Sequence, residues 1–193
     1  MKKMNLKEVL IPTISLFIIC AVATVLLAFT NSVTDPMIKK LAVENAAKTR
    51  QLVLTDAASF SEEKTVQLDG EEYVYYEGYN AQNELAGYIL TTQSKGYGGA
   101  VEIMTGITAD GKVAGVETLT LNETAGLGMK AKESSFRDQY KGKLGKINVV
   151  KSNPGDDEIQ ALTGATITST AVTNAVNTAL ELYNNITGGA NNG

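Results

Sequence analysis

The feature that most limits how this chain can fold is an almost unbroken apolar run from Val9 to Phe29. At about 1.5 Å per helical residue, such a run crosses a hydrocarbon core of roughly 30 Å. A cleaved signal peptide is the alternative, but its apolar core normally spans only about 7–15 residues, and Ala28-Phe29-Thr30 is a poor cleavage site. We therefore predict a retained transmembrane helix over residues 9–30.

The charges around this run predict its orientation. Three of the first eight residues are lysines, whereas the first positive charges after the run are Lys39 and Lys40. Positive charges concentrate on the cytoplasmic side of membrane spans. We expect a single-pass protein of the cell membrane, with residues 1–8 in the cytoplasm and the main domain on the extracytoplasmic side.

The composition excludes several kinds of chemistry. The chain has no histidine, and its one cysteine, Cys20, lies in the apolar run. Nucleophilic sites that need an imidazole, metal sites with histidine or several cysteines, and intrachain disulfides are therefore excluded. From Asn31 onward the chain carries 14 basic and 20 acidic residues, which disfavours a nucleic-acid partner. We expect no catalytic residues and no metal, so any redox or group-transfer work would need an organic cofactor.

A helix is predicted directly after the membrane span. Thr34-Asp35-Pro36 is typical of a helix start, with a capping side chain followed by proline in the first turn. Apolar positions then continue to about Leu54. Residues 31–56 are therefore predicted to form a stalk helix and linker.

The next part of the chain predicts an antiparallel sheet. Runs rich in Val, Ile, Thr and Tyr alternate with turn residues, and Asp69-Gly70 and Asp110-Gly111 are strong hairpin signals. Two hairpins in series favour antiparallel pairing over parallel crossover units. Strands are expected at residues 65–68, 72–79, 85–92, 100–108 and 112–121.

The last third of the chain returns to helical periodicity. The fold class is therefore α+β, an antiparallel sheet with flanking helices, over residues 57–187, followed by a flexible tail at 188–193. The last helix should bury Val172, Val176, Ala179 or Leu180, and Tyr183. The other expected elements are a helix at 130–140, a strand at 147–150, a turn at 153–155 and the last helix at 167–186.

The segment Leu162–Ser169 opens that last helix. Thr168 or Ser169 can serve as its N-cap, and free N–H groups at a helix start favour a phosphate, so a phosphate-esterified Thr166 would sit well there. Gly164 allows a sharp turn and Ala165 adds little bulk. A simple capping sequence is the alternative, and spacing alone does not decide between the two.

Three motifs resemble those of the FMN-binding domain family. Leu162–Ser169 resembles the Ser/Thr-Gly-Ala-Thr acceptor motif, in which a flavin transferase joins the FMN phosphate to the final threonine, here Thr166. Lys95–Gly99 and Asn122–Gly128 fit the same family, and the second is similar to its Glu-Thr-Pro-Gly-Leu-Gly loop. Ala125 replaces the proline of that loop, and Gln160 stands where the family often has aspartate before the acceptor motif.

The resemblance implies a covalent FMN site without catalytic residues of its own. We expect an apolar wall of Tyr97, Leu127 and Met129, although packing beside glycines or in the core would explain the same residues. Polar contacts are expected from Glu123, which could instead be a solvated carboxylate, and from Thr124. The full predicted set is Thr163, Gly164, Ala165, Thr166 and Thr168, together with Tyr97, Glu123, Thr124, Gly126, Leu127 and Gly128.

A short chain with one N-terminal span and one external FMN domain resembles the G subunit of the Rnf complexes, which are ion-translocating ferredoxin:NAD⁺ oxidoreductases. The C subunit of the Na⁺-pumping NADH:quinone reductases is a close relative within the same family. The resemblance implies a membrane-anchored electron carrier without turnover alone. It also implies other complex subunits as partners and a flavin transferase for maturation. Two alternatives stay open: a stand-alone tethered FMN protein that feeds an extracellular reductase, and a non-redox anchored domain whose motif is only a helix cap.

Overall fold

The computed structural model describes residues 6–188. Most of the predicted cytoplasmic segment, residues 1–8, and of the predicted tail, residues 188–193, therefore lies outside the described residues. The chain divides into two compact units, Met1–Asn45 and Ala46–Gly193.

One long helix, α1 (Leu6–Val53), begins the described chain. Its stretch Leu10–Ile38 is long and apolar enough to cross a membrane, by length and composition, and its large apolar side chains are exposed. The prediction of a helix start at Thr34 was wrong, because α1 continues through Pro36. The Thr34 hydroxyl donates back to the carbonyl of Thr30 at 3.0 Å instead of capping a new helix.

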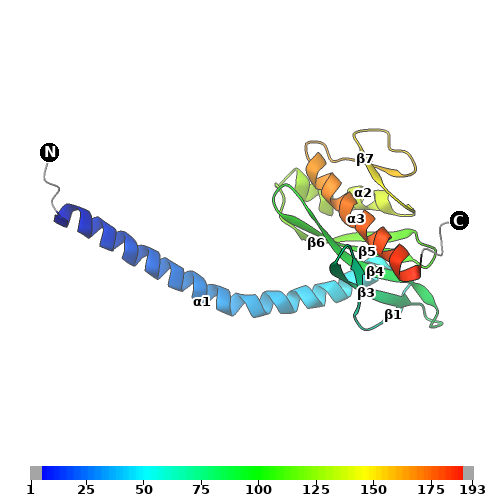
Figure 1. Cartoon of the computed structure of the whole chain (residues 1–193), viewed down its shortest axis with the longest axis horizontal. Coiled ribbons are helices and arrows are strands. Elements are labelled where there is room, and N and C mark those ends of the chain that lie inside the picture. The colour runs from blue at the N-terminus through cyan, green and yellow to red at the C-terminus, as the bar shows by residue number, and fades with distance from the viewer. Residues whose placement is uncertain (1–5, 189–193) are drawn as a thin grey trace. The chain divides into compact units, whose positions relative to one another are not determined.

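The second unit is built around an antiparallel sheet (Figure 1). Its strands follow the order β1-β3-β4-β5-β6, and the short strands β1 and β2 both pair with β3, which pairs with β4 as well. The hairpin turns predicted at Asp69-Gly70 and Asp110-Gly111 are present, and both glycines have positive φ angles. The strands are β1 (Ser59–Phe60), β2 (Lys64–Leu68), β3 (Glu71–Tyr79), β4 (Leu85–Lys95), β5 (Ala100–Thr108) and β6 (Val113–Leu121).

The last helix, α3 (Thr166–Thr187), covers one face of this sheet (Figure 1). The predicted apolar stripe of α3 is buried, with Val172, Val176 and Ala179 fully enclosed, and Leu180 and Tyr183 nearly so. They pack against the strand residues Leu90, Ile103 and Ile107, among others. The predicted α+β class, an antiparallel sheet with flanking helices, is confirmed.

The end of α1 covers the other face of the sheet. Val53 and Leu54 are buried against Ile89 and Met104 in a second, smaller core. A Cβ atom added at Gly106 would overlap the carbonyl oxygen of Val53. The backbone of α1 therefore rests directly on strand β5, and this contact belongs wholly to the second unit.

The segment between β6 and α3 is broken into short pieces. The prediction of a single helix over residues 130–140 was wrong. Glu133 has an extended backbone, and it interrupts the helical conformation between Lys132 and Ser134. Phe136 and Tyr140 anchor this region in the main core. The pieces are η1 (Gly128–Lys132), α2 (Ser134–Arg137) and η2 (Asp138–Tyr140), followed by the parallel pair β7 (Asn148–Val150) and β8 (Glu158–Gln160).

Candidate functional site

The acceptor-like segment forms a tight turn at the start of α3. Gly164 has a φ of +76°, which favours glycine, and the N–H of Ala165 donates to the carbonyl of Leu162 at 3.0 Å. The sharp turn predicted at Gly164 is therefore present. A Cβ atom on Gly164 would lie 3.3 Å from Cδ2 of Leu127, so the turn also packs closely on the preceding loop.

The N-cap of α3 is Ala165, and it makes no side-chain capping bond. The prediction that Thr168 or Ser169 caps the helix was therefore wrong. Both residues lie inside the first turn and are almost completely buried. The Ser169 hydroxyl donates to the carbonyl of Ala165 at 3.0 Å, and the Thr168 hydroxyl donates to Oε2 of Glu123 at 3.0 Å. Both hydroxyls thus hold the surrounding structure in place.

Thr166 is the first residue of α3, and it is exposed. It is flanked by buried Ala165 on one side and by exposed Ile167 on the other. The first N–H groups of a helix have no partners within the helix, and the helix dipole adds partial positive charge there. The hydroxyl of Thr166 is therefore accessible at a place that favours an anion.

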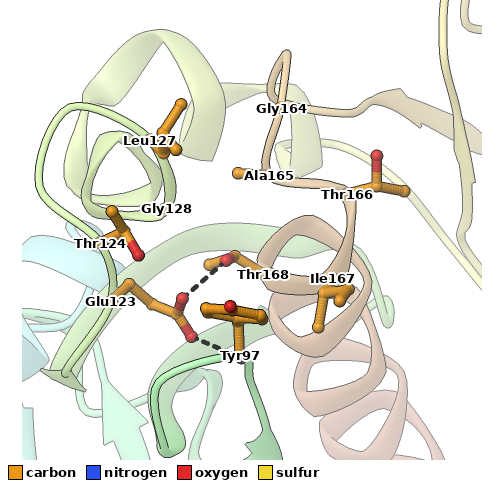
Figure 2. Close-up of a pocket in the computed structure, with 10 residues that line it drawn as sticks. All are labelled: Tyr97, Glu123, Thr124, Leu127, Gly128, Gly164, Ala165, Thr166, Ile167 and Thr168. Carbon is orange, nitrogen blue, oxygen red and sulfur yellow. Dashed lines mark hydrogen bonds between the residues drawn. The ribbon is translucent and has the colours of Figure 1, made fainter.

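A cavity of about 610 Å³ lies beside Thr166 (Figure 2). Three segments that are distant in sequence meet around it: the turn after β4, the loop after β6 and the start of α3. The lining residues are Tyr97, Glu123, Thr124, Leu127, Gly128, Gly164, Ala165, Thr166, Ile167 and Thr168. Nine of the eleven predicted site residues are thus brought together.

Two predicted residues do not line this cavity, and one lining residue was missed. Thr163 lines a smaller cavity of about 360 Å³, and Gly126 provides a left-handed turn with a φ of +77°. Met129, which we expected in the apolar wall, is half-buried against the main core. Ile167 was missed because an apolar residue at a helix start is equally typical of a core position.

The apolar part of the rim is exposed. Tyr97 is 73% exposed, Ile167 is 56% exposed and Leu127 is 44% exposed. Large apolar side chains gathered around a concave site are typical of a surface that contacts a ligand or a partner.

The two loops on the sheet side of the cavity are tightly fitted to each other. A Cβ atom on Gly98 would overlap the carbonyl oxygen of Asn122. The turn after β4 is closed by a hydrogen bond of 2.7 Å from the N–H of Gly96 to the carbonyl of Gly99. The second loop is closed by hydrogen bonds of 3.1 and 3.2 Å from the N–H groups of Leu127 and Met129 to the carbonyl of Thr124.

Arg137 connects the segment after this loop to the sheet. Its guanidinium donates to the carbonyl of Val116 at 2.8 Å, to the carbonyl of Lys132 at 3.0 Å, and pairs with Glu117. Burial lowers the pKa of Arg137 from its ordinary value. Among residues 6–188, no group of three or more acidic or cysteine side chains could hold a metal ion.

Comparison with known proteins identifies the family of this chain. An FMN-binding domain model matches residues 96–181, a range that contains every residue lining the larger cavity. The G subunit of the Na⁺-translocating ferredoxin:NAD⁺ oxidoreductase complex of Acetobacterium woodii is 40% identical over 186 residues, which cover 89% of each chain. The chain belongs to the G-subunit family of ion-translocating oxidoreductase complexes. The predicted resemblance is thereby confirmed.

Other members of the G-subunit family match over almost the whole chain. The G subunit of the proton-translocating ferredoxin:NAD⁺ oxidoreductase complex of Clostridium ljungdahlii is 37% identical over 92% of each chain. The G subunit of an ion-translocating oxidoreductase complex of Methanosarcina acetivorans is 27% identical over 91% of this chain and 94% of its own. The prediction that the chain is a subunit of an ion-translocating redox complex is therefore confirmed at the level of the family.

The fold is shared with the C subunit of a related complex. The crystal structure of the C subunit of the Na⁺-translocating NADH-quinone reductase from Parabacteroides distasonis aligns with a TM-score of 0.51 at 21% identity, over 77% of this chain and 82% of that one. NqrC of Shewanella oneidensis gives the same TM-score at 19% identity, over 65% and 66% of the two chains. These similarities support the fold of this G-family protein.

Proposed function

We propose that this protein carries FMN joined through its phosphate to Oγ1 of Thr166, as an electron-relay subunit of an ion-translocating ferredoxin:NAD⁺ oxidoreductase complex. The observation that carries the proposal is the position of Thr166. Its exposed hydroxyl lies at the edge of the cavity of about 610 Å³, within the segment that matches the FMN-binding domain.

The cavity suits FMN in size and chemistry. Sites for small ligands and cofactors span about 300–1,000 Å³ and combine a mostly apolar lining with a few polar groups. Tyr97, Leu127 and Ile167 supply the apolar surface for a flat ring, and the Thr124 side chain adds a polar group. When bound, FMN supplies electron transfer, which the side chains of this histidine-free chain do not offer.

Thr166 is a better acceptor than the other threonines of the segment. Thr168 is 1% exposed, and its hydroxyl is already a donor to Glu123. Thr163 is exposed but lines the other cavity. Thr166 alone among these three threonines is both exposed and part of the larger cavity.

The start of α3 suits the phosphate of the ester. The first turn of α3 contains no acidic residue, so the positive end of the helix dipole is not offset within the helix. A flavin transferase would supply an activated FMN phosphoryl group, such as that of a flavin dinucleotide. The phosphorus–oxygen bond to Oγ1 forms, the bond to the nucleotide phosphate breaks, and the hydroxyl proton is released to solvent.

We further propose that α1 anchors the protein in the membrane, with the FMN domain on the extracytoplasmic side. The apolar stretch Leu10–Ile38 and the lysines that precede it support this orientation. A covalent bond keeps a cofactor that works outside the cytoplasm from being lost by dissociation. Two relatives of this chain are named as G subunits of ion-translocating ferredoxin:NAD⁺ oxidoreductase complexes. In such a complex, the other subunits would deliver electrons to the FMN and accept electrons from it.

Co-expression tests the proposal. The full chain is produced with and without a flavin transferase, denatured, separated on a gel and viewed for flavin fluorescence. We expect fluorescence only with the transferase, its loss in Thr166→Val, and its retention in Thr163→Val. If the Thr166→Val variant kept flavin and the Thr163→Val variant lost it, the acceptor would be Thr163. The absence of fluorescence from every sample would refute covalent attachment.

The flavin content and the copurifying subunits of the same purified protein distinguish the proposal from the two alternative functions. A stand-alone tethered FMN protein would carry flavin but would not copurify with multispan membrane subunits. A domain whose motif is only a helix cap would carry no flavin. The N-cap of α3 is Ala165 without a side-chain capping bond, and this disfavours the second alternative.

A further inference from the structure

Glu123 occupies a central position in the wall of the cavity. Among the described residues that line the cavity, it is the one with a charged side chain. Its Oε1 accepts a hydrogen bond from the N–H of Tyr97 at 2.9 Å, and its Oε2 accepts one from the hydroxyl of Thr168 at 3.0 Å (Figure 2). Oε1 also accepts a hydrogen bond from the N–H of Gly98 at 3.3 Å. The carboxylate thus connects its own segment, the loop after β6, to the other two segments that form the site.

The donors come from distant parts of the chain. Tyr97 and Gly98 precede Glu123 by 26 and 25 positions, and Thr168 follows it by 45. These bonds therefore hold the turn after β4 and the first turn of α3 to the loop after β6. Bonds to an ionised acceptor are roughly twice as strong as neutral ones, so they suit this task.

Two glycines enclose the carboxylate. A Cβ atom added at Gly96 would overlap Oε1 of Glu123. A Cβ atom added at Gly128 would lie 2.8 Å from the Cβ atom and 2.9 Å from Oε2 of Glu123. Gly96 belongs to the motif at residues 95–99, and Gly128 ends the motif at residues 122–128. The need to leave room for the Glu123 side chain gives a physical reason for glycine at both positions.

These contacts also redefine the predicted role of Glu123. We expected a polar contact to the cofactor or a solvated loop carboxylate. A carboxylate offers about four acceptor positions, and three of them here receive donors from the protein itself. The side chain is half-buried and directed inward between the loops, so a purely solvated role does not describe it.

We propose that Glu123 is the positioning residue of this cavity: its carboxylate fixes Tyr97 and Thr168 relative to each other and so sets the shape of the wall beside Thr166. The inference rests on the proposed function in one respect, namely that the ligand facing this wall is a flavin. The positioning itself is a property of the protein before any cofactor is attached, and it can be measured there.

The test uses amide hydrogen exchange in the full chain in detergent, before flavin attachment. Glu123→Ala should speed exchange of the Tyr97 and Gly98 amides by about tenfold or more, since losing a charge-assisted hydrogen bond is worth about that factor. The amides of the buried strand residues Leu90 and Ile103 should keep their wild-type rates. Unchanged exchange at Tyr97 and Gly98 would overturn the proposal.

Matched variants separate positioning from general stability. Glu123→Gln keeps an acceptor oxygen for the two amides, so their exchange should stay near the wild-type rate. Glu181→Ala, which removes an exposed carboxylate from α3, should change nothing. Faster exchange throughout β4 and β5 in both Glu123 variants would identify a role in overall stability instead, and would also overturn the proposal.

Flavin loading supplies a separate readout. After co-expression with a flavin transferase, the absorption spectrum of the flavin in Glu123→Ala should shift towards that of free FMN, while Glu181→Ala keeps the wild-type spectrum. A wild-type chain that takes up no flavin contradicts the proposed function but leaves the exchange result intact. A wild-type flavin spectrum in Glu123→Ala, despite faster amide exchange, would overturn the claim that this residue sets the wall.

Discussion

The hydroxyl of Ser169 accepts a hydrogen bond of 2.9 Å from the backbone N–H of Leu162, seven residues earlier in the chain. The same hydroxyl donates to the carbonyl of Ala165 at 3.0 Å. Ser169 is fully buried. One side chain inside α3 therefore connects both ends of the turn that precedes Thr166, and this turn determines where the Thr166 hydroxyl lies.

Replacing Ser169 with alanine should therefore destabilise the fold and disturb the turn. The half-buried N–H of Leu162 would lose its partner, which costs about 1–3 kcal/mol of unfolding free energy. Denaturant unfolding of the full chain in detergent measures the effect. Thr170→Ala is the matched control, because Thr170 is the neighbouring hydroxyl residue and is exposed; equal losses in the two variants would contradict this role of Ser169.

The contact between the end of α1 and β5 predicts a second effect. In Gly106→Ala the new methyl group would overlap the carbonyl oxygen of Val53, and overpacking of this kind costs about 1–3 kcal/mol. The midpoint of thermal unfolding should fall. Gly155→Ala serves as the control, since its Cβ would lie at ordinary van der Waals distance, 3.5 Å, from the nearest neighbouring atom, Oε2 of Glu158. A stable Gly106→Ala variant would show that α1 does not rest on the strand.

The acid dependence of stability is predicted from Glu77 on β3. The Lys64 ammonium, 2.7 Å from Oε1, and then the hydroxyl of Tyr79, 2.6 Å from Oε2, hold the pKa of Glu77 below its ordinary value of 4.5. A lowered folded-state pKa contributes stability that is present above the unfolded pKa and is lost as the pH falls through the folded one.

Glu77→Gln should therefore be less stable than the wild type at pH 7, and the difference should shrink as the pH falls below 4.5. Urea unfolding of both chains across this range measures it. The effect should be modest, because Lys64 is partly exposed to solvent. A difference that stays constant from neutral pH down through the acid range would show that the ionisation of Glu77 does not contribute.

Local signals in the sequence predicted the sheet well, because hairpin turns depend on a few adjacent residues. Asp69-Gly70 and Asp110-Gly111 require positive φ angles that glycine provides, and the strands beside them follow the predicted ranges closely. Strand β1 has only two residues, too short for any periodic pattern. The strand predicted at residues 147–150 is present as β7, but its parallel partner β8, which has only three residues and follows a loop, was not predicted.

Residue types at helix ends were less reliable signals. Pro36 and Thr34 have the residue types of a helix start, yet α1 continues through them, and the Thr34 hydroxyl bonds to the carbonyl of Thr30 within the same helix. Thr168 and Ser169 have the residue types of an N-cap, but their hydroxyls bond to Glu123 and to the turn before the helix. In the site, motif resemblance located the three segments, whereas only the fold shows that Glu123 joins them.

Peptide mass spectrometry tests the covalent attachment of FMN to Thr166 most directly. The full chain, co-expressed with a flavin transferase, is digested, and the fragment that contains residues 162–169 is sequenced by fragmentation. We predict a mass gain equal to FMN less one water, located on Thr166 and absent from the Thr166→Val variant. The same mass on Thr163 or Thr168, or an unmodified fragment from a fully co-expressed sample, would contradict it.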